Sequence, residues 1–245
     1  MISRSKDDQV MKALILASGL GKRLRPLTEK NPKALIHLGK KSILERMVRL
    51  LIKNNVVDII ITTGHLENQI KDFIKTKFPS LNVTYINNPI YDKTNYIYSL
   101  WLARDAVGDD DIVLLHSDMV FEPGLLKKVI VFKDSGVLVK KSLPYPQKDF
   151  KASIEGGLVS KIGVSIEGEN LRFLAPVYKF KNADFRKFLI KIDNFIKEGK
   201  TNSYAEDAFN EISGQIKLHP IYFDNEFCME IDDFDDLKTA KKYFN

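Results

Sequence analysis

The sequence predicts an α/β fold, with a Rossmann-like, mainly parallel sheet flanked by helices and a smaller antiparallel region. Short apolar runs alternate with segments of helical apolar spacing from residue 11 to about residue 140. Strand–helix alternation of this kind implies right-handed crossovers between parallel strands. After residue 142 the pattern changes to short strands bounded by Pro and Gly, which is typical of antiparallel pairing. Ligands bind at the carboxyl ends of parallel strands, so polar residues that follow the strands are the first candidates for a site.

Each element follows from its local pattern. The run 13–17 is uniformly apolar, which favours a strand buried on both faces. In the first part we expect strands at 13–17, 58–62, 83–86, 112–115 and 136–139, and helices at 43–51, 67–78, 95–106 and 123–132. In the second part we expect strands at 152–154, 158–162, 173–180, 216–223 and 228–231, and helices at 183–197, 204–212 and 233–243. No linker long enough to separate domains interrupts residues 11–245, which therefore predict a single domain.

The composition limits the class of protein. Of 245 residues, 44% are hydrophobic and 29% charged, as in an ordinary globular chain with a core. The net charge of +6 suits a phosphate-rich ligand, but the basic residues are spread along the chain, so we expect no nucleic-acid partner. A single cysteine, Cys228, excludes an intramolecular disulfide and fits a reducing, cytoplasmic compartment. No run approaches the ~18 apolar residues of a membrane span, and residues 1–10 predict a disordered lead-in without a signal-peptide core.

A glycine loop with clustered cations follows the first strand. Ser18-Gly19-Leu20-Gly21 lets the backbone approach a ligand and turn its N–H groups inward, and Lys22, Arg23 and Lys33 supply positive charge. That combination predicts a polyphosphate ligand. A dinucleotide fingerprint or a P-loop counted from Gly19 would need glycine at position 24, where this chain has Leu24.

The segments Gly19-Leu20-Gly21-Lys22-Arg23-Leu24 and Pro32-Lys33-Ala34-Leu35 resemble the signature of nucleotidyltransferases that join an NTP to a phosphorylated small molecule. The resemblance implies that the glycine loop wraps the triphosphate, that Arg23 binds its β/γ part, and that Lys33 meets the α-phosphate, which makes Arg23 and Lys33 the catalytic pair. It implies an NTP-binding half at 11–140 and an acceptor-binding half at 141–245. The nucleotide-binding residues expected from it are Leu16, Ala17, Ser18, Gly19, Gly21, Lys22, Arg23, Lys33, Asn95 and Ser117.

Two aspartates are candidates for a Mg²⁺ site. Asp118 follows the buried strand 112–115 and would point into the cleft that the glycine loop faces. Asp232 lies in Glu230-Ile231-Asp232-Asp233, which also matches the metal-binding pair of the resembled family. An N-cap or turn role is the alternative for both aspartates. His116 lies beside them, and we expect a structural role for it, because a phosphate or phosphonate nucleophile is already anionic and needs no base.

The acceptor is less sharply defined. The segment 91–101 and the closing E-I-D-D resemble the choline-phosphate branch of cytidylyltransferases, which implies CTP as donor; 2-aminoethylphosphonate, phosphocholine and phosphoethanolamine all stay open as acceptors. A positively charged tail wants aromatic faces or carboxylates, and a lysine could hold the acceptor's phosphate. We prefer a primary amine, because carboxylates outnumber aromatic faces near residue 204. The acceptor-binding residues expected on these grounds are Tyr98, Lys140, Lys151, Tyr204, Glu206, Asp207 and Glu230.

Together these features predict a Mg²⁺-dependent cytidylyltransferase that transfers CMP from CTP to a small amino-alkyl phosphate or phosphonate and releases pyrophosphate. A sugar-1-phosphate or inositol-phosphate nucleotidyltransferase is the nearer alternative, and it would show neutral, hydroxyl-reading groups. A non-catalytic nucleotide-binding regulatory module is the alternative from another class; it would not need metal carboxylates aimed at the α-phosphate. The sequence leaves a homodimer open.

Overall fold

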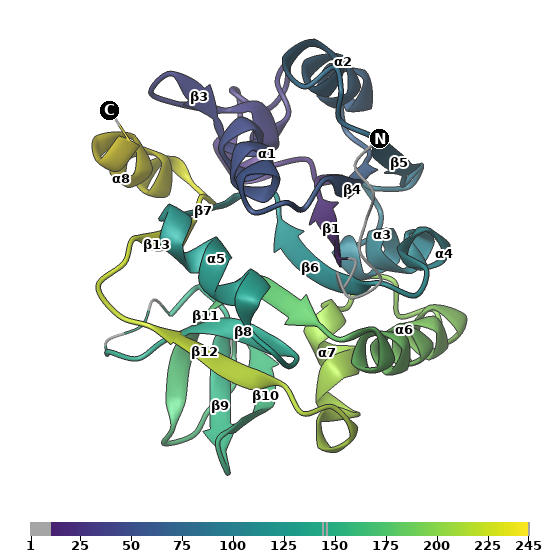
Figure 1. The fold of residues 1–245 in the computed structure, drawn as a ribbon, viewed down its shortest axis with the longest axis vertical. Coiled ribbons are helices and arrows are strands. Elements are labelled where there is room, and N and C mark those ends of the chain that lie inside the picture. The colour runs from purple at the N-terminus through teal and green to yellow at the C-terminus, as the bar shows by residue number, and fades with distance from the viewer. Residues whose placement is uncertain (1–10, 144, 146, 245) are drawn as a thin grey trace.

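A computed structural model describes residues 11–143, 145 and 147–244 of the chain. Its centre is a nine-stranded sheet in which β5, β4, β1 and β6 run parallel, in that order across the sheet (Figure 1). Beyond β6 the sheet continues antiparallel through β11 to β9 and β10, while β8 pairs antiparallel with β11 and parallel with β12. The fold class is confirmed as a mixed α/β sheet, with its parallel and antiparallel parts joined at the β6–β11 pair. The predicted lead-in at 1–10 lies outside the described residues.

The parallel part contains the crossovers that the sequence predicts. It comprises β1 (Met11–Leu16), α1 (Ile43–Lys53), β4 (Asp58–Thr63), α2 (Glu67–Lys77), β5 (Val83–Asn87), α3 (Tyr96–Leu102), α4 (Arg104–Val107), β6 (Asp111–His116), β7 (Met119–Phe121) and α5 (Pro123–Val131). Helix α1 begins at Ile43 because the Ser42 side chain accepts a hydrogen bond from the backbone N–H of Glu45, and α5 begins with Pro123, which needs no hydrogen-bond donor there.

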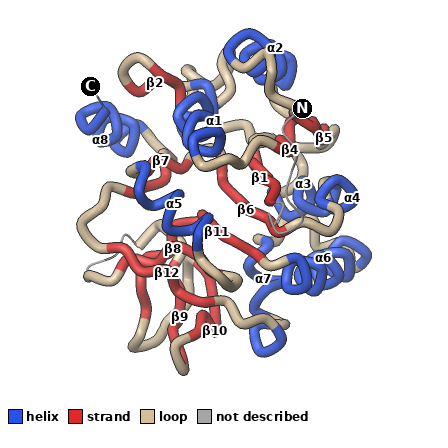
Figure 2. Tube along the Cα trace, viewed as in Figure 1, coloured by secondary structure: helices blue, strands red, loops and turns tan. Residues whose placement is uncertain are grey.

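The second part is built mainly from strands with antiparallel pairings. Figure 2 shows strands β8 to β12 gathered on one side of the molecule. It comprises β8 (Gly136–Lys140), β9 (Lys151–Glu155), β10 (Leu158–Gly163), β11 (Leu171–Phe180), α6 (Asn182–Lys197), α7 (Ala205–Asn210), β12 (His219–Phe223), β13 (Cys228–Glu230) and α8 (Phe234–Phe244). Strand β11 is the central connector, because it pairs with β6, β8 and β9 along its ten residues.

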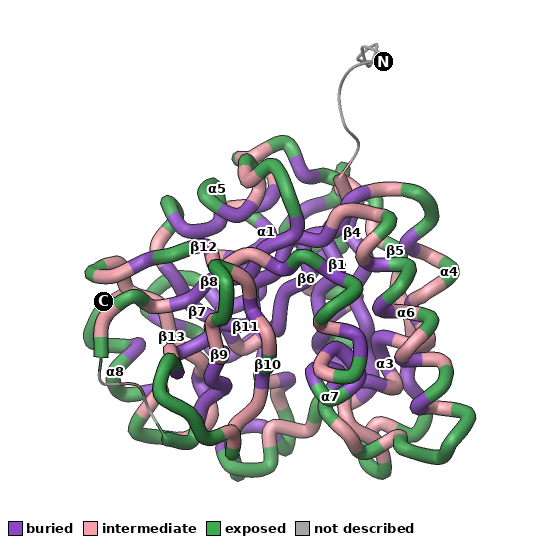
Figure 3. Tube along the Cα trace, turned by 90° about the horizontal axis from the view of Figure 1, so that it is seen from below, coloured by how far each residue is buried: buried purple, intermediate pink, exposed green. Residues whose placement is uncertain are grey.

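Successive residues of the central strands pack into opposite layers, as the two-residue period of a strand requires. Ala13 and Ile15 of β1 face the layer of α1, α2 and α5, whereas Leu14 and Leu16 face the layer of α3, α6 and α7. Strands β1, β4 and β6 are therefore buried almost along their whole lengths (Figure 3). This rigid centre holds the loops that follow β1 and β6 at a common edge.

Four differences from the sequence prediction concern short or interrupted elements. Helix 95–106 divides at Ala103 into α3 and α4. Strand 216–223 begins only at His219, after a 3₁₀ turn at Ser213–Gln215. Strand β7 pairs antiparallel with β13, and the two-residue strands β2 (His37–Leu38) and β3 (Lys41–Ser42) form a hairpin; none of these pairings was predicted. Two further 3₁₀ turns, at Lys22–Leu24 and Lys33–Leu35, shape the cationic loop.

Candidate active site

A cleft of about 690 Å³ opens at the carboxyl ends of β1 and β6. All ten residues predicted to bind the nucleotide line it, and so do Asp118 and Asp232. The sequence thus places one continuous set of side chains in one cleft, although the set is drawn from positions more than 200 residues apart. The remaining lining residues are Leu20, Ala34, Tyr91, Asp92, Lys93, Thr94, Tyr96, His116 and Asn202.

The glycine loop is held in its turn by contacts from behind. Gly21 has a φ of +60°, and a Cβ there would lie 2.9 Å from Cγ2 of Thr28 and 3.3 Å from Cβ of Lys33. The buried Thr28 hydroxyl donates to the carbonyl of Gly21 at 2.8 Å, and the Thr28 carbonyl lies 2.8 Å from Nε2 of His65. Glycine is needed at position 21 because both its backbone conformation and the space beside it exclude a side chain.

Buried polar groups connect the glycine loop to the opposite wall of the cleft. The hydroxyls of Ser18 and Ser99 lie 2.7 Å apart. The Asn88 amide donates to Ser99 and to Thr94, each at 3.0 Å. Because these groups are removed from water and satisfy one another, they fix the spacing of the two walls.

Four charged side chains meet at one end of the cleft. Nζ of Lys33 lies 2.6 Å from Oδ2 of Asp118 and 3.0 Å from Oδ1 of Asp232. Nη2 of Arg23 lies 2.8 Å from the same oxygen of Asp232. Lys33 is 14% exposed, whereas Arg23 is 62% exposed and lies at the solvent side of the cluster.

The charges of this cluster stabilise one another. Burial alone would lower the pKa of the Lys33 ammonium, but Asp118 and Asp232 outweigh it and hold the pKa above its ordinary value. Burial would raise the pKa of Asp118, but Lys33, with a smaller contribution from His116, holds it below its ordinary value. Lys33 and Asp118 therefore stay charged at neutral pH.

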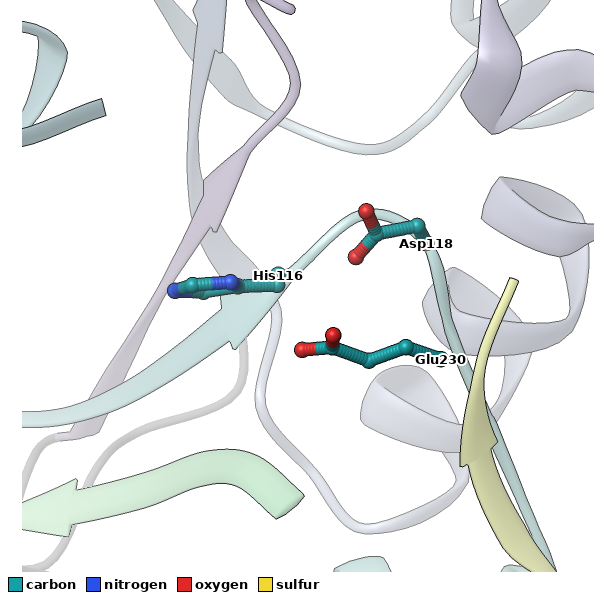
Figure 4. A group of neighbouring side chains, drawn as sticks. All are labelled: His116, Asp118 and Glu230. Atoms are coloured by element: carbon teal, nitrogen blue, oxygen red, sulfur yellow. The ribbon is translucent and has the colours of Figure 1, made fainter. Parts of the chain in front are cut away.

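The donor set around Asp118 fits a hard cation such as Mg²⁺. Oδ1 of Asp118 is buried and has no hydrogen-bond partner in the part of the chain that the structure describes, which leaves one carboxylate oxygen available as a ligand. His116, Asp118 and Glu230 have potential ligand atoms within 4.8 Å of one another, and so do Asp149, Glu230 and Asp232. Figure 4 shows the carboxylates of Asp118 and Glu230 pointing into the same space beside the His116 ring.

Two of these carboxyls carry strongly perturbed protons. Burial, followed by the charge of Asp118, raises the pKa of Glu230 well above its usual range, and burial raises the pKa of Asp149 to about 6. Both groups face a site already crowded with negative charge, so an incoming cation would lower the pKa of each.

Comparisons with known proteins agree with this geometry. The family model described as nucleotidyl transferase matches residues 12–149, more than half of the chain. The chain belongs to the nucleotidyl transferase family. The matched region contains the glycine loop, Lys33 and Asp118, whereas Asp232 lies outside it.

Individual relatives of this nucleotidyl transferase include a choline-phosphate cytidylyltransferase of Streptococcus pneumoniae, 39% identical over 42% of this chain and 43% of the relative. A bifunctional IPC transferase and DIPP synthase of Aquifex aeolicus is 28% identical over 94% of this chain and 51% of the relative. The chain thus spans about half, or less, of the length of these curated relatives. Among solved structures, a CTP:phosphocholine cytidylyltransferase of Streptococcus pneumoniae superposes with a TM-score of 0.78 at 24% identity, covering 96% of this chain and 99% of that one, which shows a shared fold.

The residues predicted to bind the acceptor are not gathered in the same way, and none of the seven lines the 690 Å³ cleft. Tyr98 packs beside Trp101, with ring centroids 5.4 Å apart, and Lys140 ends β8, paired with Phe223 of β12. Lys151 is buried and donates to the Gln147 carbonyl at 3.0 Å.

The remaining acceptor candidates lie near the cleft but behind its wall. Asp207 accepts a hydrogen bond from the backbone N–H of Tyr204 and so caps α7, and Tyr204 is 41% exposed, with its ring centroid 6.0 Å from that of Tyr96. Glu206 is buried, and its carboxylate accepts hydrogen bonds from the hydroxyls of Tyr96 and Tyr178. Its oxygens bond to Tyr96, which lines the cleft, and to Tyr178, which is buried behind it, and the contact of Glu206 with the acceptor stays a prediction. Glu230 alone faces the metal-binding candidates.

Sequence reasoning missed Asp149 and Asn202, and it left Tyr96 out of the expected acceptor-binding residues, although the sequence offers Tyr96 as an aromatic face. Asp149 lies in an irregular link between two strands, where no periodic pattern indicates the direction of a side chain. Asn202 is brought to the cleft through the loop 198–204, whose Thr201 carbonyl accepts from the backbone N–H of Asn95 at 2.9 Å. The segment 91–96 belongs to the stretch that resembles the choline-phosphate branch of cytidylyltransferases. That resemblance was a signal from which the other cleft-lining residues of this segment could have been proposed.

His116 lines the cleft as the last residue of β6, and its ring meets the Tyr96 ring edge-on at 4.6 Å. Its Nε2 is buried without a hydrogen-bond partner among the described residues.

Within the described part of the chain, no helix is both long and apolar enough to cross a membrane.

Proposed function

We propose that this chain is a Mg²⁺-dependent cytidylyltransferase that transfers CMP from CTP to a small amino-alkyl phosphate or phosphonate, with release of pyrophosphate. The observation that carries the proposal is the position of Lys33, which bridges Asp118 and Asp232 beside a glycine loop at the edge of a parallel sheet. Binding alone does not require two aspartates and a lysine at that point, whereas nucleotidyl transfer does.

The reaction follows from the residues that line the cleft. An anionic oxygen of the acceptor attacks the α-phosphorus of CTP, a new P–O bond forms, and the bond to the β-phosphate oxygen breaks. Arg23 and the backbone N–H groups of residues 19–21 would hold the triphosphate, and Lys33 would meet the charge that grows on the α-phosphate. Asp118 and Asp232 would hold Mg²⁺, which supplies positive charge to the leaving pyrophosphate.

No general base is needed in this scheme. The attacking phosphate or phosphonate oxygen is already ionised at neutral pH, so no proton has to be removed. His116 then contributes packing against Tyr96 rather than proton transfer.

The single cysteine fits a reducing compartment, and a cytoplasmic location is part of the proposal.

A positively charged acceptor tail is supported by the character of the wall near α7. Aromatic rings of Tyr96, Tyr204 and Phe150 follow one another there, with centroids 6.0 and 5.1 Å apart. Glu230 adds a carboxyl on the same side as the metal-binding candidates. Relatives named choline-phosphate cytidylyltransferase and, at 30% identity over 44% of this chain, 2-aminoethylphosphonate cytidylyltransferase of Lancefieldella rimae agree with such an acceptor.

An inositol phosphate is the second candidate acceptor. The relative from Aquifex aeolicus aligns over 94% of this chain, including the acceptor half, and an inositol-1-phosphate CTP transferase of T. maritima shares the fold with a TM-score of 0.79 at 20% identity. This acceptor has no cationic tail, so it would make no use of the aromatic rings near α7 as a cation-binding face.

A pyrophosphate-release assay tests the proposal. The purified chain would be supplied with each of the four NTPs, with and without Mg²⁺, and with phosphocholine, phosphoethanolamine, 2-aminoethylphosphonate, inositol-1-phosphate or glucose-1-phosphate. We expect release with CTP, Mg²⁺ and at least one amine. No release with any combination would contradict nucleotidyl transfer, and preferential use of inositol-1-phosphate would replace the amine by the second candidate.

A further inference from the structure

Glu206 is a buried acid without an obvious structural reason. It is the second residue of α7 and only 4% exposed, whereas acidic residues in the first turn of a helix are usually solvated. The cavity of about 10 Å³ beside it is lined mainly by apolar residues such as Leu114, Ile162, Phe180 and Phe209, together with Tyr96, Tyr178 and His116. A carboxyl in such a place is costly unless its charge has a partner.

Two phenols are the hydrogen-bond partners of Glu206. The Tyr178 hydroxyl donates to Oε1 at 2.7 Å, and the Tyr96 hydroxyl donates to Oε2 in a short contact. Each carboxyl oxygen therefore receives its own donor, which is the arrangement that suits a carboxylate. Burial and the neighbouring charge of Glu206 raise the pKa of both tyrosines well above the ordinary value, so both remain donors.

No cation balances this carboxylate. Across the described residues, no Lys, Arg or His side chain lies within ion-pair distance of Glu206. The cations nearest the cleft are otherwise engaged, since Lys33 and Arg23 pair with Asp118 and Asp232. A buried charge with neutral partners only is a source of negative potential for whatever occupies the space next to it.

Tyr96 carries that potential to the cleft. It lines both the 690 Å³ cleft and the small cavity beside Glu206, so it forms the partition between them. A phenol that donates its proton to a carboxylate gains electron density in its ring, and cations bind to the faces of electron-rich rings. Tyr178 offers no such route, because it is buried behind the wall and lines only the small cavity of the two.

We infer that Glu206 is a specificity-determining residue that selects a positively charged acceptor without touching it, by polarising and positioning the Tyr96 ring at the cleft wall. The inference rests on the proposed function and deepens it. It assigns the preference for a cationic tail to the hydrogen-bonded unit of Glu206 and Tyr96, and it gives Tyr178 only the task of completing the hydrogen bonds of Glu206.

Binding measurements with matched pairs of acceptors test this inference. Calorimetry in Mg²⁺ and α,β-methylene CTP, which cannot transfer CMP, would compare 2-aminoethylphosphonate with propylphosphonate, and phosphocholine with 3,3-dimethylbutyl phosphate. Within each pair only the charge of the tail differs. We expect the wild type to bind the cationic member of at least one pair about tenfold or more tightly than the neutral member.

The variants separate charge from structure. Glu206→Gln keeps the shape and one acceptor oxygen, replaces the other by an amide donor, and removes the charge. It should bring the ratio within a pair close to one without changing the affinity for the nucleotide. Tyr96→Phe should also lower the ratio, whereas Tyr178→Phe, which removes the other donor to the same carboxylate, should preserve it. Glu211→Gln is the matched surface control, because it removes an equal charge at the solvent-exposed end of α7.

Three results would overturn the inference. The wild type could bind the cationic and the neutral acceptor of each pair equally, or Glu206→Gln could keep the wild-type affinity ratio. Glu206→Gln could also lose affinity equally for both acceptors and for the nucleotide. Should Glu206→Gln fail to fold, the pair Tyr96→Phe and Tyr178→Phe decides, and equal ratios in these two would overturn it. If the wild type prefers the cationic member of a pair but releases no pyrophosphate in the turnover assay, the proposed function is wrong and the binding inference is not. The two failures are therefore distinguishable.

Discussion

The two halves of the molecule differ in how their candidate side chains reach the site. In residues 11–140 the nucleotide candidates sit at the carboxyl ends of parallel strands or in the segments that connect these strands to the next element, and every one of them lines the cleft. Apart from Tyr98 of α3, the acceptor candidates come from strands with antiparallel pairings and from the start of α7, and all seven lie outside the lining of that cleft. The carboxyl end of a parallel strand fixes where the next residue points, whereas an antiparallel strand or a short helix leaves the direction to long-range packing. Phosphate chemistry is therefore easier to locate from a sequence than acceptor choice.

The largest expected effect lies where the two halves meet, at the pair of aspartates. Asp118→Asn and Asp232→Asn should each lower kcat by about 10²-fold or more, because each removes a charge that would hold Mg²⁺. Steady-state pyrophosphate release measures the effect, and Asp235→Asn, on the exposed side of α8, is the control. Full activity of the wild type in EDTA would contradict the metal assignment.

The glycine loop offers a smaller effect confined to the first half. Gly21→Ala puts a Cβ 2.9 Å from Thr28 in a backbone conformation that favours glycine, so the loop must shift. We expect the KM for CTP to rise about tenfold, as a displaced set of phosphate contacts would give. Gly124→Ala, where a Cβ has no neighbour within 4 Å, is the matched control. An unchanged KM in Gly21→Ala would show that the loop does not carry the triphosphate.

A pH-dependent effect on stability belongs to the second half. Because the pKa of Asp149 is about 6 in the folded chain and ordinarily 3.8, the folded state binds this proton more tightly than the unfolded state does. The free energy of unfolding should therefore fall as pH rises through this window. In EDTA and without nucleotide, Asp149→Asn should melt a few degrees above the wild type at about pH 7.5, and the two should converge near pH 4. Parallel melting curves at all pH values would contradict the assignment.

The smallest expected effect concerns Lys140, which the sequence predicted to hold the acceptor's phosphate. Lys140 ends β8 beside Phe223, away from the lining of the cleft. We expect Lys140→Met to change the acceptor KM by less than about twofold, as for a surface substitution remote from a ligand. A rise in the acceptor KM of about tenfold, the size expected for the CTP KM in Gly21→Ala, would support the sequence prediction and weaken the contrast between the halves.

The elements themselves were mostly predictable, since the apolar period of each strand and helix is local. Strands β2, β3 and β7 were missed because two or three residues cannot display a period. The β7–β13 pair matters most, since it aligns Glu230 with Met119 and so brings the C-terminal acids beside Asp118. Only the resemblance of the E-I-D motif to known enzymes indicated that neighbourhood in advance.

The acceptor wall shows what the sequence could not settle. The sequence predicts that Tyr204, Glu206 and Asp207 all face the acceptor. Consecutive residues of a helix, however, point in different directions. Asp207 caps its own helix, and Glu206 points into the core to meet Tyr96 and Tyr178. Those two tyrosines come from α3 and β11, and only the folded chain places them together.

The central claim is that the first half performs nucleotidyl transfer and does not merely bind a nucleotide, and Lys33→Ala tests it most directly. The kinetics of pyrophosphate release should be measured at saturating Mg²⁺ and acceptor while CTP is varied. We expect kcat to fall by about 10²-fold or more while the KM for CTP changes only a few-fold, because the charge that Lys33 meets grows in the transition state. A higher KM with an unchanged kcat would contradict the claim and leave Lys33 as a binding residue.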